Sequence, residues 1–103
     1  MDAFTISGVT YCCGETDSVV AKEKVKFIDL TEHAVNITCP LYIQHGVQDE
    51  LIPFAQAKKL EEAVVNVSEL VTQFEEKGIH CCHNLSHVNR HPMADFLAKH
   101  LNI

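Results

Sequence analysis

A carboxylate and an imidazole in this chain each follow a short apolar segment and could work together as an acid–base pair. Asp49 lies three residues after Gly46, which ends one apolar segment, and His80 comes soon after a second segment and Gly78. A carboxylate beside an imidazole fixes the tautomer of the ring and stabilises its charged form, which suits the ring to general-base work. An acid followed by a histidine matches the last two members of a triad in the order Ser, acid, His. We therefore predict that Asp49 and His80 are catalytic, as acid and base.

The nucleophile that would complete such a triad has no candidate with the right sequence context. None of the four serines lies in Gly-x-Ser-x-Gly, the pattern of a sharp turn between a strand and a helix. A cysteine nucleophile at Cys12 or Cys13 would lack this turn as well. We therefore expect the chain to be unable to perform the reaction alone. The four serines are Ser7, Ser18, Ser68 and Ser86.

Each predicted site residue also has a simpler interpretation. Asp49 could cap the next helix or form an Asx turn, and spacing alone does not separate this role from catalysis. His80 is one of seven histidines and could be an ordinary loop residue, although its place after the Gly78 break favours it over the later ones. The run from His80 through Cys81 and Cys82 to His83 could instead bind zinc. Adjacent ligands are difficult to bring onto one ion, however, and no good second pair exists.

The composition excludes several classes of protein. The 103 residues carry a net charge of -6 with scattered basic residues, so no nucleic-acid partner is expected. No apolar run is long enough to cross a membrane, and the N-terminus lacks the pattern of a signal peptide, so we expect a cytoplasmic protein with no membrane partner. Five cysteines, an odd number with two adjacent pairs, indicate reduced thiols rather than a disulfide framework.

The hydrophobic pattern predicts an α/β chain in the order helix, strand, helix, strand, helix. This order implies parallel strands joined by a crossover helix. Two strands cannot bury both faces and both edges of a parallel sheet, so we expect a partner chain, a homo-oligomer or further polypeptide to cover an edge. The expected elements are a strand or extended arm at 2–13, a helix at 17–28, strands at 39–45 and 68–74, and helices beginning at Pro53 and Pro92.

Two segments resemble α/β-hydrolases. Residues 37–53, ITCPLYIQHGVQDELIP, resemble the penultimate segment of these enzymes: an apolar strand, His-Gly, an Asp and a hydrophobic-Pro step. Residues 76–84, EKGIHCCHN, with the closing helix around Asp95, resemble a narrower group. That group holds dihydropseudooxynicotine hydrolase, esterase-like proteins and fungal polyketide-shortening hydrolases, in which a Gly-x-His-x-Cys-x-Asn run carries the triad histidine.

The resemblance implies a partial α/β-hydrolase fold made of the last parallel strands and helices of the sheet. Residues 29–103 would be the C-terminal segment with the triad acid Asp49 and base His80, and residues 1–28 the end of a helical cap or a linker. The substrate would be a small-molecule ester or a ketone cleaved at a neighbouring C–C bond. This chemistry needs no cofactor and no metal. The alternative is a non-catalytic interaction or dimerisation remnant of the same fold.

Overall fold

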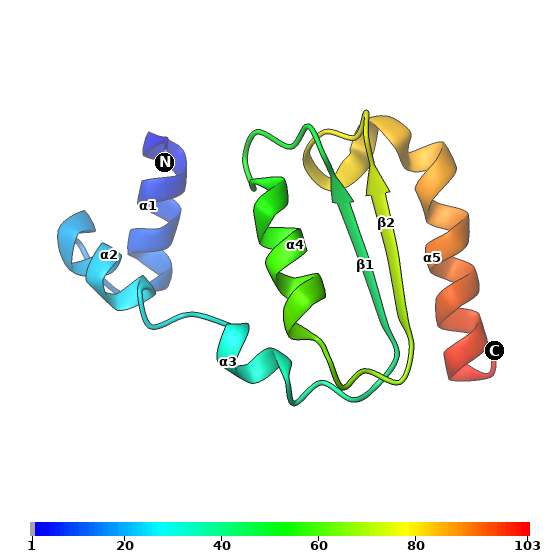
Figure 1. Cartoon of the computed structure of the whole chain (residues 1–103). Coiled ribbons are helices and arrows are strands. Elements are labelled where there is room, and N and C mark those ends of the chain that lie inside the picture. The colour runs from blue at the N-terminus through cyan, green and yellow to red at the C-terminus, as the bar shows by residue number, and fades with distance from the viewer. Residues whose placement is uncertain (1) are drawn as a thin grey trace. The chain divides into compact units, whose positions relative to one another are not determined.

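The computed structural model describes residues 2–103 and divides the chain into one unit that ends at Leu30 and a second unit, Thr31–Ile103 (Figure 1). This boundary says nothing about the role of the first unit, so the assignment of residues 1–28 to a cap stays a prediction. No helix within residues 2–103 is long and apolar enough to cross a membrane.

The first unit is a pair of helices, α1 (Ala3–Cys12) and α2 (Ser18–Val25). The predicted strand or extended arm at 2–13 is therefore wrong. Asp2 caps α1 by accepting hydrogen bonds from the backbone N–H and the hydroxyl of Thr5, and this local cap outweighs the β-branched composition. The predicted helix at 17–28 is confirmed as α2, which is shorter than expected and buries Ala21.

Two parallel strands form the centre of the second unit: β1 (Leu41–Gly46) and β2 (Leu70–Glu75). Their register pairs Leu41 with Leu70 and Gly46 with Glu75, so the two strands end side by side. The predicted strands are confirmed, each shifted by one or two residues. Helices with this small parallel sheet are compatible with a partial α/β fold.

The crossover helix α4 (Phe54–Ala63) begins directly after Pro53, as predicted, and covers one face of the sheet. Alternate residues of a strand point to the same face of the sheet, so apolar residues of β1 and β2 on this face pack against those of α4. The short helix α3 (Thr31–Ala34) adds to this core. The core consists of Ala34, Ile43, Ala57 and Val64, with Ile37, Leu41, Phe54, Leu60, Ala63, Val67 and Phe74 packed against it.

The last helix, α5 (Ser86–Leu101), lies beside β2 in Figure 1, and the ring of its Phe96 meets the ring of Tyr42 from β1 edge-on at 5.3 Å. The prediction that this helix begins at Pro92 is wrong, because Pro92 lies inside it. The helix continues through Pro92 although proline has no backbone N–H to donate. The segment η1 (His80–Leu85), which consists of short 3₁₀ turns interrupted by a kink at Cys81 and Cys82, precedes it and was not predicted.

Candidate active site

The loops that follow β1 and β2 lie against each other at one rim of the sheet. Since the strands are parallel, their carboxyl ends meet there, which is where open α/β sheets gather functional groups. Backbone hydrogen bonds connect the two loops: Val47 N–H donates to the carbonyl of Glu75, and Gln48 N–H to that of Gly78, each at 2.9 Å. Each loop therefore fixes the position of the other.

Gly46 and Gly78 allow this close approach. A Cβ added at Gly46 would lie 2.4 Å from the carbonyl oxygens of both Gly78 and Ile79. A Cβ added at Gly78 would lie 3.0 Å from the Cα of Gly46. Both distances are below those of ordinary contacts, so a side chain at either position would separate the loops.

Asp49 is anchored in its loop by the backbone. Its Oδ1 accepts hydrogen bonds from the N–H groups of Leu51 at 2.8 Å and Ile52 at 2.9 Å. This is the Asx-type turn that was one interpretation of the sequence. Only 3% of the side chain is exposed, so the turn aims a largely buried carboxylate at the second loop.

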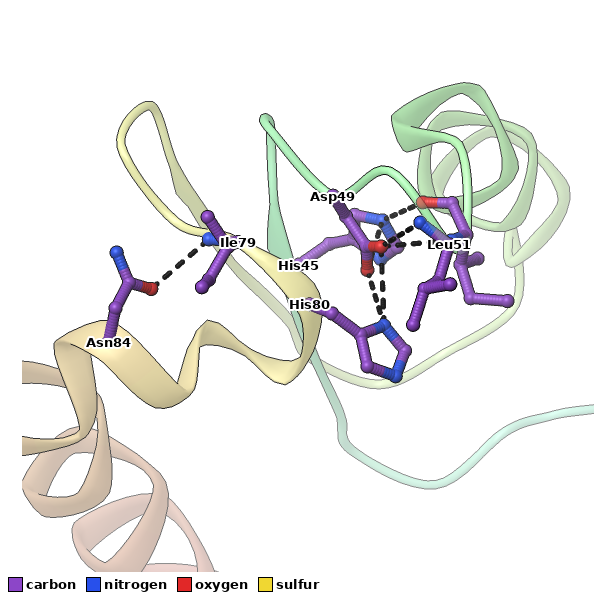
Figure 2. Close-up of polar contacts among 7 residues, drawn as sticks. His45, Asp49, Leu51, Ile79, His80 and Asn84 are labelled. Atoms are coloured by element: carbon purple, nitrogen blue, oxygen red, sulfur yellow. Dashed lines mark hydrogen bonds and ion pairs between the residues drawn. The ribbon is translucent and has the colours of Figure 1, made fainter.

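The structure brings His80 onto that carboxylate. Nδ1 of His80 lies 3.0 Å from Oδ2 and 3.2 Å from Oδ1 of Asp49. An ionised carboxylate only accepts hydrogen bonds, so Nδ1 carries the hydrogen and Nε2 of a neutral ring is left as an acceptor. In Figure 2, Nε2 points away from Asp49. The His80 side chain is 41% exposed.

A second imidazole, which sequence reasoning missed, also faces Asp49 (Figure 2). Nε2 of His45 lies 3.0 Å from the carbonyl oxygen of Ile52 and 3.7 Å from Oδ2 of Asp49. Because a carbonyl accepts, Nε2 is the nitrogen of His45 that carries the hydrogen, and it donates to Ile52 rather than to Asp49. The sequence does indicate that His45 lies close to Asp49, because His45 immediately precedes Gly46, the residue that ends β1.

These contacts determine the charge state of Asp49. Burial of the carboxylate acts to raise its pKa. The hydrogen bond from Ile52 N–H, the bond and positive charge of His80, and the bond from Leu51 N–H oppose this effect and outweigh it. The net result is a pKa of Asp49 below its ordinary value, so the carboxylate is ionised at neutral pH.

An open cavity of about 370 Å³ lies in front of His80. A small molecule of modest size would fit at this rim with access to the imidazole. The cavity is lined by Gln48, Glu50, Leu51, Ile79 and His80.

The cysteines and histidines that were weighed as metal ligands form no such cluster in the part of the chain that the structure describes. Within residues 2–103, no three His, Cys, Asp or Glu side chains are placed to share a metal ion. Cys82 is fully buried whereas its neighbour Cys81 is exposed. Cys12 ends α1 and Cys13 caps it, both in the first unit.

Over part of its length the chain is related to a hydrolase. The relative is the 2,6-dihydropseudooxynicotine hydrolase of Paenarthrobacter nicotinovorans, with 44% identity over 61 residues. The match covers 59% of this chain but spans only 16% of the relative. No protein-family model and no solved structure matches the chain.

Proposed function

We propose that this chain is the C-terminal segment of a serine α/β-hydrolase and supplies the acid and the base of its triad. The observation that carries the proposal is the contact of His80 Nδ1 with the buried carboxylate of Asp49, at the rim where two parallel strands end. The substrate would be an ester, or a ketone cleaved at a neighbouring C–C bond. Residues 1–28 would be the end of a helical cap.

His80 would act first as base and then as acid. Its Nε2 would take the proton of a serine hydroxyl as that oxygen attacks the carbonyl carbon, and would later return the proton to the leaving group. Asp49 would stay ionised throughout and stabilise the imidazolium, a role that agrees with its lowered pKa. The reaction itself requires no cofactor.

The serine would come from polypeptide other than these 103 residues, in which no serine has the required context. It would approach the exposed side of His80 to hydrogen-bond distance from Nε2, about 2.6–3.2 Å. The donors that stabilise the oxyanion would come from the same source. In this proposal the chain alone is inactive.

A chimera tests the proposal. The second unit, residues 31–103, replaces the part of the Paenarthrobacter hydrolase that contains the 61-residue match, and hydrolysis of 2,6-dihydropseudooxynicotine is measured. We expect activity in the chimera, a loss of about 10⁴-fold in kcat with Asp49→Asn and of about 10⁶-fold with His80→Ala. Asp49→Asn preserves the shape of the side chain, so its effect reports on charge and tautomer.

Asp95→Asn is the matched control, because it makes the same chemical change at an exposed position of α5. It should leave kcat unchanged. A folded chimera whose activity survives His80→Ala would disprove the proposal.

A second candidate function, a non-catalytic interaction module, is favoured by the apolar surface. Outer residues of α5 such as Leu97 and Leu101 are 53% and 60% exposed. Within the described residues each strand pairs only with the other, so each has an edge with no neighbouring strand. A second copy of the chain would cover these surfaces in a dimer.

A further inference from the structure

The backbone that leads away from His80 is strained. Cys81 has φ 57° and ψ 12°, and Cys82 has φ 50° and ψ 28°, so two consecutive non-glycine residues are left-handed. Such residues persist only where their surroundings hold them. The backbone N–H of Cys82 donates to the carbonyl of Ile79 at 2.8 Å, and its carbonyl accepts from Asn89 Nδ2 at 3.0 Å. These bonds hold the turn after His80.

A different side chain holds the segment before His80. The amide of Asn84 reaches back from η1: its Nδ2 donates to the carbonyl of Lys77 at 2.9 Å, and its Oδ1 accepts from the N–H of Ile79 at 3.1 Å. Figure 2 shows the second of these bonds. One side chain therefore bridges the two residues that flank Gly78.

Gly78 is the point at which the histidine loop meets the aspartate loop. Its carbonyl accepts the hydrogen bond from Gln48 N–H, one residue before Asp49. The same oxygen occupies the space that a side chain at Gly46 would need. Because Asn84 bonds both neighbours of Gly78, it fixes the orientation of the Gly78 peptide group. The carbonyl of that group contacts the aspartate loop, so its orientation determines the distance between Asp49 and His80.

We propose that Asn84 is a positioning residue for the acid–base pair: its side-chain amide holds residues 77–79 in the conformation that aims His80 at Asp49. Asn84 contributes neither the acid nor the base and acts only through the backbone. The inference rests on the proposed function, in which Asp49 and His80 work together.

The experiment measures the pKa of Asp49 in the full chain, from the carboxyl ¹³C resonance as a function of pH. Asp49 reports on the geometry because the bond and charge of His80 help to lower its pKa. His80→Ala removes this contribution and should raise the pKa of Asp49. Asn84→Ala, which leaves both partners in place, should raise it in the same direction as His80 moves away.

Two further variants make the result specific. Asn66→Ala is the matched control: Asn66 Nδ2 donates to the carbonyl of Val35 at 2.7 Å, an exposed bridge over a long sequence separation within the same unit. It should lower stability and leave the pKa of Asp49 at its wild-type value. Asn84→Gln retains the amide and should give a smaller rise than Asn84→Ala, so the test does not depend on one variant remaining folded.

Each outcome has a distinct meaning. A rise with His80→Ala and with Asn84→Ala, but not with Asn66→Ala, supports the positioning role. A rise with His80→Ala and none with either Asn84 variant overturns this inference while the proposed pair stands. If His80→Ala itself leaves the pKa of Asp49 unchanged, the pairing fails, and the proposed function and the inference fail with it.

Discussion

At the scale of single residues, the site depends on one carboxylate that satisfies several donors at once. Oδ1 of Asp49 accepts from two backbone N–H groups, and both of its oxygens face Nδ1 of His80. The His45 ring lies near the same carboxylate, with Nε2 at 3.7 Å from Oδ2, but the hydrogen bond of that nitrogen goes to the carbonyl of Ile52. An anion surrounded by donors is stabilised relative to its protonated form, which explains why the pKa falls although the side chain is largely buried.

Because the pKa of Asp49 is lowered in the folded chain, the free energy of unfolding depends on pH in the acid range. Because the native carboxyl group binds a proton less readily than the unfolded one, the unfolded chain takes up protons first as the pH falls, and acid favours unfolding. The contribution of Asp49 is fully present above its ordinary pKa of 3.8 and is lost as the pH drops through the lower native value. We expect Asp49→Asn to destabilise the chain in urea at pH 7 and this difference to shrink below pH 3.8.

Asp95→Asn, which makes the same chemical change at an exposed position, is the control for this measurement. If the difference between wild type and Asp49→Asn stayed constant down to the acid range, the carboxylate would not be stabilised as an anion in the native state.

At the scale of elements, the sequence predicts best what depends on local periodicity. Both strands and α4 were predicted because apolar runs, Pro53 and Gly46 mark them directly. The sequence also predicted that Asp49 and His80 would lie close together, since each follows a strand and a glycine, and the structure places them in contact. The bridge made by Asn84 could not be predicted, because it depends on a left-handed turn at Cys81 and on backbone groups brought together only by folding.

The two mistaken element predictions have the same origin. The β-branched composition of residues 2–13 favours a strand, yet a single cap at Asp2 starts a helix there. Pro92 favours a helix start, yet α5 begins six residues earlier at Ser86. In both places a preference based on residue type, which is only a weak guide to conformation, was overridden, at residues 2–13 by the cap that Asp2 provides.

The contact between the two glycines gives a prediction at this scale. Gly46→Ala should lower the free energy of unfolding by about 1–3 kcal/mol, because the new Cβ would overlap the carbonyl oxygens of Gly78 and Ile79. The same displacement should raise the pKa of Asp49, since His80 moves with its loop. Urea denaturation and the carboxyl ¹³C resonance measure the two effects.

Gly8→Ala provides the contrast, because a Cβ at Gly8 in α1 meets nothing within 4 Å. It should stabilise the helix by about 0.5–1 kcal/mol. Equal effects of the two substitutions would show that the loops do not meet at Gly46.

At the scale of the whole molecule, the balance between buried and exposed apolar surface is unusual. Within residues 2–103 only six apolar residues are buried, and the largest fully buried side chain is that of Cys82. Eighteen large hydrophobic residues are exposed, and exposed apolar residues mark an interaction site where they gather in a patch. The two-stranded parallel sheet is open as well, since within the described residues each strand pairs only with the other and leaves one edge without a neighbouring strand. Both features favour contact with further polypeptide.

The chain should therefore self-associate when studied alone. Met93, Leu97 and Leu101 follow one another at four-residue spacing along α5 and are 39%, 53% and 60% exposed, so they form an apolar stripe on that helix. Light scattering after gel filtration should show a mass that rises with concentration. Leu97→Glu, which places a charge within the stripe, should shift the chain towards monomer, whereas Gln56→Glu, at an exposed polar position of α4, should not. A wild-type chain that stays monomeric at high concentration would rule out the dimerisation module and leave the hydrolase segment as the explanation of its apolar surface.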